Sequence, residues 1–268
     1  MNDVLIAQDG SRIAYSIEGS GPILFLVGAP VGIQGFSQLA SLLRDEFTVV
    51  LHDPRGIGLS TNNAAGQLFP EVLANDLASL IQRVAADNVL IFGASGGAVT
   101  AIELLCHQSS LVDFLVAHEP PLFKLLPDQN KTLNAANNAF AQAHDDIEAG
   151  LEAFANLTEI FHSTYADSPR PKPIKLPPLT PEESAKNRFF LTRMAGPTVN
   201  YSPQIEKLIE QPLCIAAGLA SIGQPARNSS ISLAALIRQS VVNAPGNHLA
   251  ASTLPVEFSK WLKEILIH

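Results

Sequence analysis

The chain has 268 residues, of which 47% are hydrophobic, enough to bury the core of one large α/β domain. Its 17 lysine and arginine residues are outnumbered by 25 aspartate and glutamate residues, which gives a net charge of -8 at pH 7. This charge would repel phosphate backbones and anionic lipids, so the composition argues against binding to nucleic acid or to a membrane surface and favours a small-molecule partner.

The beginning of the chain, Met1 to Gly10, contains an acidic residue and no long apolar stretch, and no run of about 18 uncharged apolar residues occurs elsewhere. We therefore expect neither a signal peptide nor a membrane-spanning helix. Cys106 and Cys214 lie in apolar segments and form no metal-ligand or disulfide pattern, so we expect two buried thiols and a cytoplasmic location.

Short β-prone runs recur along the chain. Val4 to Ala7 and Arg12 to Ile17 flank Asp9-Gly10, a pair that favours the positive φ angles of a tight hairpin turn. Continuous apolar runs, typical of parallel strands that are covered on both faces, follow the hairpin. They are Ile23 to Val27, Thr48 to Leu51, Val89 to Phe92, Val112 to Val116, Leu213 to Ala217 and Val241-Val242.

Helical patterns alternate with these runs. The clearest has one apolar face made of Leu73, Leu77, Leu80, Ile81 and Val84, and shorter patterns occur around Leu39 and Ile102. The alternation predicts a doubly wound, mostly parallel, eight-stranded sheet of the α/β class, with its active site at the carboxyl ends of the strands.

The alternation stops between about Leu122 and Leu208, where helical stretches rich in Asn, Ala and Gln surround a proline-rich segment, Ser168 to Pro178. We expect residues 122–208 to form a helical lid inserted after the sixth strand, and residues 1–121 and 209–268 to form the core. A segment of this length can cover a pocket, although it could also be additional helical bulk.

A glycine-rich segment follows Val89 to Phe92. Its centre, Gly93-Ala94-Ser95-Gly96-Gly97, fits the nucleophile-elbow pattern G-x-S-x-G. In such an elbow the serine takes a strained backbone conformation that exposes its hydroxyl, and small neighbours let strand and helix approach closely. The pattern predicts Ser95 as a nucleophile at a helix N-terminus, where free N–H groups favour a developing negative charge.

The same segment permits two other interpretations. It resembles the glycine-rich turn of nicotinamide-dependent reductases, in which Glu119 could bind the ribose. However, Ser95 replaces the second glycine of G-x-G-x-x-G, Val99 fills the third-glycine place of the G-x-x-G-x-x-G variant, and the turn does not follow the first strand. A purely structural tight turn is the second alternative.

His248 is the predicted general base. It stands in the loop Ala244-Pro-Gly-Asn-His248, after the last predicted strand. The order serine then histidine, with the histidine in this loop, is that of the triad of this fold class.

The acid of such a triad usually follows the penultimate strand, where this chain reads Gly218-Leu-Ala-Ser221. Residues 213–247 contain no Asp or Glu, so another strand must supply the acid. Glu119, at the carboxyl end of the strand after the nucleophile helix, is our prediction. Glu119 could instead be a surface carboxylate at the first turn of the lid, and Asp53 is explained by a tight turn.

Acyl transfer also needs two donors for the developing oxyanion. The backbone N–H of Gly96 is the first candidate. In the loop Val27-Gly-Ala-Pro-Val-Gly32, Pro30 has no N–H, so Ala29 or Gly28 must provide the second, unless this is an ordinary glycine-rich turn.

Together, these segments resemble the α/β-hydrolase superfamily across essentially the whole chain. The resemblance is carried by the Val27-Gly28-Ala29 loop, the Asp53-x-Arg-Gly-x-Gly-x-Ser60 turn, the Gly93-x-Ser95-x-Gly97 elbow and the Pro245-Gly-Asn-His248 loop. Ala117-His-Glu-Pro-Pro121 is similar to the His-Glu-x-Pro segment of fungal zearalenone-type lactonases. The resemblance implies that Glu119 completes the triad in place of the usual aspartate.

The chain departs from this pattern at two places. Val27 stands where a histidine commonly precedes the oxyanion-loop glycine, and its single tryptophan, Trp261, falls in the C-terminal helix and not in the lid. Macrolactone specificity therefore does not carry over. For the substrate pocket we expect Pro30 and the lid residues Phe189, Phe190 and Tyr201.

The sequence predicts a serine hydrolase that cleaves a small-molecule ester or lactone through an acyl-enzyme, without a metal or cofactor. The alternatives are a binding protein of the same fold without catalysis and a nicotinamide-dependent reductase. Thioester or C–C bond cleavage and a homodimer also stay open.

Overall fold

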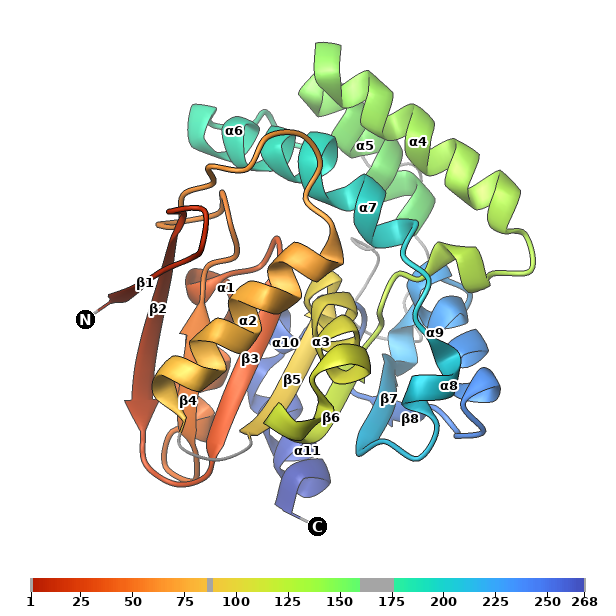
Figure 1. Cartoon of the computed structure of the whole chain (residues 1–268). Helices are drawn as coiled ribbons and strands as arrows, with labels where there is room; N and C mark the ends of the chain where they lie inside the picture. Colours follow the sequence, from red (N-terminus) through yellow and green to blue (C-terminus); the bar gives the residue numbers. More distant parts are fainter. Residues whose placement is uncertain (1, 86–88, 160–175, 268) are drawn as a thin grey trace.

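A single eight-stranded sheet lies at the centre of the part of the chain that the computed structural model describes, residues 2–85, 89–159 and 176–267 (Figure 1). The strands lie in the order β1-β2-β4-β3-β5-β6-β7-β8. Their bounds are β1 Asp3–Ile6, β2 Arg12–Gly19, β3 Ile23–Ala29, β4 Thr48–His52, β5 Val89–Ser95, β6 Val112–His118, β7 Leu213–Gly218 and β8 Val242–Ala244.

The pairing confirms the predicted mostly parallel sheet. β1 pairs with β2, and β2 with β4, in antiparallel fashion, whereas every pair from β4 across to β8 is parallel. The glycine-rich turn follows β5, the third strand of the parallel part. In a dinucleotide-binding sheet this turn follows the first strand and the strand order is 3-2-1-4-5-6, so the topology differs from that of the nicotinamide-dependent alternative.

Helices cover both faces of the sheet. α1 (Ile33–Leu43), α10 (Ala250–Thr253) and α11 (Pro255–Ile267) pack on one face, and α2 (Pro70–Val84), α3 (Gly96–His107) and α9 (Pro225–Leu236) on the other. Successive side chains of a strand point to opposite faces, so in β3 Leu24 and Leu26 join the first layer whereas Phe25 and Val27 join the second. This double burial explains the continuous apolar runs in the sequence.

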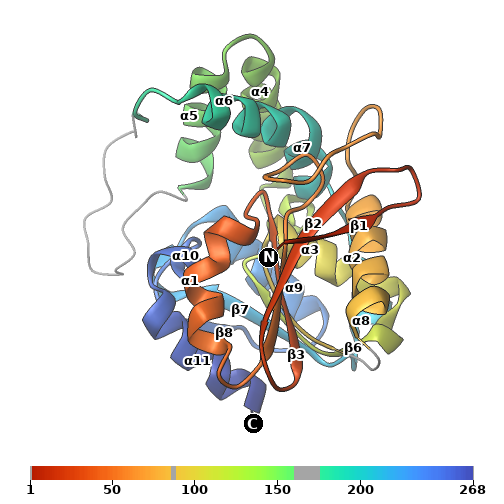
Figure 2. The same cartoon turned by 90° about the vertical axis from the view of Figure 1, so that its left-hand side faces the viewer.

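Between β6 and β7 the chain leaves the sheet and forms further helices. They are α4 (Gln129–Asp145), α5 (Ile147–Thr158), α6 (Pro181–Phe189), a π-helix (Phe190–Met194), α7 (Ala195–Val199) and α8 (Ile205–Leu208). Figures 1 and 2 show α4 to α7 standing over the edge of the sheet where the parallel strands end; these helices are called the cap below. Of the expected proline-rich segment, residues 168–175 lie outside the described residues.

Local sequence signals explain the cap helices. Asp146 Oδ1 accepts a hydrogen bond of 3.0 Å from Ala149 N–H at the start of α5. Thr180 and Glu183 form a capping box at the start of α6. A Cβ on Gly150 would lie 2.6 Å from Ala143, so this glycine lets α5 approach α4 closely.

The buried guanidinium of Arg55 connects the turn after β4 to neighbouring elements. Arg55 donates to both carboxylate oxygens of Asp76 on α2, and to Asp9 and Ser11 of the β1–β2 hairpin. Its side chain is only 5% exposed. This network joins the turn after β4 to the β1–β2 hairpin and to α2 through charged hydrogen bonds.

Candidate active site

Ser95 lies at the last position of β5, directly before α3. Its φ of 56° and ψ of -125° are unusual for a residue with a side chain, so the turn holds it in a strained conformation. The neighbouring glycines allow this turn, because a Cβ on Gly97 would lie 2.1 Å from Val27 O and one on Gly93 would lie 2.8 Å from Ala98 Cα. The hydroxyl of Ser95 is thereby held at the N-terminus of a helix of 12 residues.

His248 follows β8 and lies in the loop before α10, with 7% of its surface exposed. Its Nδ1 lies 2.7 Å from Oε2 of Glu119. Its ring lines the same cavity as Ser95, but the contacts of the described residues include no hydrogen bond between the Ser95 hydroxyl and the imidazole. Such hydrogen bonds are often long before substrate binds.

Glu119 is completely buried at the end of β6. Its backbone N–H donates to Ala216 O at 3.0 Å, and its Oε1 accepts the N–H of Gly218 at 2.8 Å. Burial by itself raises the pKa of Glu119. The hydrogen bond with His248 and the nearby imidazoles lower it by more, so the net pKa lies below the usual range. An ionised carboxylate can only accept, so Nδ1 of His248 carries the proton and Nε2 is left as the basic nitrogen.

His118 lies beside this group but has no polar contact. It is completely buried, and neither ring nitrogen has a hydrogen-bond partner. Its ring packs edge-on against Phe258 at 5.4 Å between centroids. Burial lowers its pKa to about 4, so it is neutral at pH 7. Its contacts are therefore those of a packing residue.

Asp53 serves the turn after β4. Its Oδ1 accepts the N–H of Ile33, the first residue of α1, at 2.8 Å, and its Oδ2 accepts that of Leu59 at 2.9 Å. Both oxygens are therefore occupied by backbone donors, as expected for a residue that closes a tight turn.

The loop after β3 brings one oxyanion candidate to Ser95. Ala29 is paired with Ser95 in the β3–β5 register, and both Ala29 and Gly96 line the cavity. Gly28 does not line it; this glycine permits close packing, since a Cβ there would lie 2.4 Å from Val31 O. Of the two alternatives for the second donor, the structure brings only Ala29 to the cavity.

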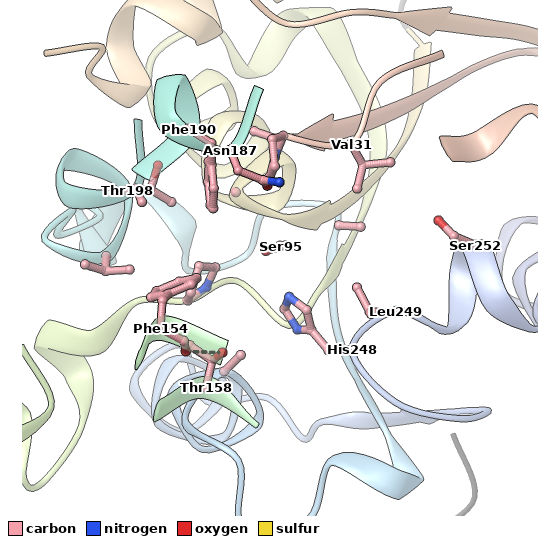
Figure 3. Close-up of a pocket in the computed structure, with 18 of the residues that line it drawn as sticks. Val31, Ser95, Phe154, Thr158, Asn187, Phe190, Thr198, His248, Leu249 and Ser252 are labelled. Atoms are coloured by element: carbon pink, nitrogen blue, oxygen red, sulfur yellow. Dashed lines mark hydrogen bonds between the residues drawn. The ribbon is translucent and has the colours of Figure 1, made fainter. Parts of the chain in front are cut away.

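A cavity of about 300 Å³ opens between the sheet edge and the cap. Figure 3 shows Ser95 and His248 facing it, with Phe154, Asn187 and Phe190 of the cap around them. Most of the lining is apolar. The larger apolar side chains that line it from outside the cap are Pro30, Val31, Phe36, Pro121, Phe123 and Leu249, and those from the cap include Leu151, Phe154, Phe190 and Val199.

The expected pocket residues are only partly in this cavity. Pro30 and Phe190 line it. Phe189 does not, because the helical turn directs it to an adjoining cavity, where it packs over Gly56. Tyr201 does not line it either, and this expectation is corrected: its ring packs in the core beside α3 and its hydroxyl donates to Glu103.

α5 and α7 contribute lining residues that were not predicted from the sequence. Leu151, Phe154 and Thr158 lie three and four residues apart on one face of α5, and Thr198 comes from α7. The helical spacing was visible in the sequence, but it could not show that this face meets the sheet edge and not another helix.

Within residues 2–85, 89–159 and 176–267 no group of three or more His, Cys, Asp or Glu side chains is arranged to hold a metal ion. None of the helices described there combines the length and apolarity that a membrane span needs.

Known proteins that are similar to this chain in sequence include hydrolases. No family model matches the chain. It is 25% identical over 272 residues to the uncharacterized hydrolase YraK of Bacillus subtilis, covering 99% of this chain and 96% of that protein. It is 32% identical to the 2-(acetamidomethylene)succinate hydrolase of Mesorhizobium japonicum over 149 residues, 54% of this chain and 52% of that protein.

Among solved structures, an esterase from Exiguobacterium antarcticum has a TM-score of 0.73 at 19% sequence identity and covers 100% of both chains. At this identity the match concerns the fold, which the two proteins share along their whole length.

Proposed function

We propose that this chain, which has the fold of the α/β-hydrolases, is a serine hydrolase that cleaves a carboxylic ester or a lactone. The observation that carries the proposal is the 2.7 Å contact between Nδ1 of His248 and Oε2 of Glu119, at the wall of the cavity that Ser95 also lines. A buried carboxylate, an imidazole and a serine in a strained turn are the components of a nucleophilic triad.

In the first half-reaction, Oγ of Ser95 attacks the carbonyl carbon while Nε2 of His248 takes the hydroxyl proton. Glu119 stabilises the resulting imidazolium. The carbonyl oxygen becomes an oxyanion and accepts hydrogen bonds from the N–H groups of Ala29 and Gly96. The C–O bond to the leaving group then breaks, the alcohol oxygen takes the proton from His248, and Ser95 carries the acyl group.

In the second half-reaction, His248 takes a proton from water, and the water oxygen attacks the acyl carbon. The same N–H groups hold the second oxyanion. Its collapse breaks the bond to Oγ, which recovers its proton from His248, and releases the carboxylic acid. For a lactone, the alcohol and the acid are two ends of one product.

The lining of the cavity supports a substrate with an apolar body. A volume of about 300 Å³ is at the small end of ligand pockets, which suits a compact molecule. The esterase of Exiguobacterium antarcticum, which has the same fold, is consistent with ester cleavage.

The test combines active-site labelling with hydrolysis. A fluorophosphonate probe should label the wild type and not Ser95→Ala, and short-chain nitrophenyl esters and simple lactones should be hydrolysed only by the wild type. Circular dichroism establishes that the variant is folded. If the folded wild type resists the probe under conditions that label a known serine hydrolase, the nucleophile assignment is wrong and a non-catalytic binding protein becomes the better description.

A further inference from the structure

One edge of the cavity is polar. Lys186 and Asn187 reach it from α6, and Ser252 reaches it from α10. Apart from His248, Lys186 is the only ionisable side chain among the described residues that line the cavity. A cation at this place contrasts with the net charge of -8 of the whole chain.

The polar groups of the cavity differ in whether they already have partners. The hydroxyls of Thr158 and Thr198 donate to backbone carbonyls of their own helices, at 2.8 and 2.9 Å. In the described part of the chain, by contrast, Lys186 has no ion pair within 4.0 Å, and the side chains of Asn187 and Ser252 make no hydrogen bond. These three side chains are therefore available to a ligand.

The neighbouring carboxylates do not neutralise this edge by direct contact. Glu183 is engaged with Thr180, from which it accepts both the backbone N–H and the hydroxyl at 2.8 Å. Glu182 and Asp53 line an adjoining cavity of about 580 Å³, which shares Val31, Lys186 and Ser252 with the first. Lys186 thus stands at the boundary between an apolar cavity and an acidic one.

We propose that the Lys186–Asn187–Ser252 edge binds a carboxylate of the substrate, so that the preferred ester or lactone has an apolar body and a free carboxylate. The proposal rests on the proposed function and names its substrate class. Lys186 supplies the countercharge, and the Asn187 amide and Ser252 hydroxyl donate hydrogen bonds. A singly charged group fits better than a phosphate dianion, because Glu182 and Asp53 lie just beyond the boundary.

The first test compares two substrates that differ only in charge: mono-4-nitrophenyl adipate, which ends in a carboxylate, and its terminal carboxamide. We expect the wild type to prefer the carboxylate in kcat/KM by about tenfold, mainly through KM. Lys186→Met and the isosteric Asn187→Asp should abolish this preference, whereas Lys260→Met, at an exposed position of α11, should keep it. Glu182→Gln should increase it.

The second test measures binding without catalysis. In the Ser95→Ala background, calorimetry with the same two esters should give tighter binding of the carboxylate, and Lys186→Met should remove the difference. Equal affinity for both esters would overturn the proposal, as would a preference that survives Lys186→Met. If the wild type hydrolyses neither ester but the Ser95→Ala protein still binds the carboxylate more tightly, the proposed function fails while the carboxylate site stands.

Discussion

Glu119 has both carboxylate oxygens committed, one to the imidazole of His248 and one to the N–H of Gly218. Its backbone φ of 48° places it in the left-handed region, where few residues with side chains are found. The side chain is thus fixed from three directions: by its own backbone, by β7 and by the loop after β8. Such fixation keeps the proton of His248 on Nδ1.

Glu119→Gln should lower kcat for ester hydrolysis by about 10³-fold or more, because an amide no longer stabilises the imidazolium or enforces the useful tautomer. The steady-state rate on a nitrophenyl ester measures this, with Glu257→Gln on the exposed side of α11 as the control. An activity of Glu119→Gln near that of the wild type would show that another group supports His248.

The position of Glu119 could be predicted because the absence of Asp and Glu from residues 213–247 left few other acids at strand ends. The pocket side chains could not be predicted equally well. Phe189 and Phe190 are adjacent in sequence, yet only Phe190 lines the cavity, because the π-helix that begins there decides the direction of each ring. A pattern of apolar residues does not contain that information.

At the scale of elements, the junction of β5 and α3 depends on the absence of side chains. Gly97 lies against the carbonyl of Val27 on the neighbouring strand, so any Cβ would force α3 away from β3. This contact is between backbone atoms and cannot be relieved by a rotamer change.

Gly97→Ala should therefore lower the free energy of unfolding by about 3 kcal/mol or more, which a urea titration monitored by circular dichroism would measure. Gly196→Ala is the matched control. Its Cβ would meet no atom closer than 3.8 Å, and alanine favours the helical conformation of α7, so this variant should be as stable as the wild type or slightly more stable.

The Arg55 network couples the β1–β2 hairpin to α2 and to the turn after β4. Arg55→Met would leave the carboxylate of Asp76 buried without its partner, at a cost of about 3–5 kcal/mol in the free energy of unfolding. Equilibrium unfolding in urea measures this cost. Arg83→Met, at an exposed position of α2, controls for the loss of a positive charge. A cost below about 1 kcal/mol would mean that the network does not hold these elements together.

The sequence predicts most elements well where the signal is local. The hairpin at Asp9-Gly10 and the helix over residues 73–84 are confirmed, and the last strand begins one residue later and ends two residues later than predicted, at Val242–Ala244. Arg55 was predictable only as part of a turn. Its partners at positions 9 and 76 lie on the β1–β2 hairpin and on α2, and they come together through tertiary packing, which single-sequence patterns do not describe.

For the whole molecule, two buried imidazoles make stability depend on pH. Burial lowers the pKa of both His52 and His118 to about 4, compared with 6.5 in an unfolded chain. Between pH 6.5 and 4 the unfolded chain therefore binds more protons than the folded protein. The free energy of unfolding falls as the pH falls through this range.

His118→Leu should reduce this dependence. Between pH 7.5 and pH 5 each buried imidazole should cost about 2 kcal/mol of stability, so the variant should lose about 2 kcal/mol less than the wild type. Urea titrations at the two pH values measure the difference. His144→Leu, on the exposed surface of α4, should follow the wild type; the same behaviour from His118→Leu would show that His118 is not the source.

Architecture at this scale was predictable for the sheet but less so for the cap. Alternating strands and helices imply that layers of helices cover the sheet, since each apolar face of the sheet must be covered. How α4 to α7 lie over the strand ends depends on helix-to-helix contacts such as that of Gly150 with Ala143, which no periodicity encodes.

The place of Glu119, immediately before the chain enters the cap, has a consequence for how substrate range can evolve. Ser95, Glu119 and His248 all lie outside the stretch from Pro121 to Leu208, and the hydroxyl of Ser229 anchors the carbonyl of Pro120 at 2.7 Å. Because this stretch is continuous in the sequence, a single recombination event could replace it and thereby replace the cap side of the cavity. The three residues proposed for catalysis would pass unchanged to each descendant, so a new specificity would not require new catalytic residues.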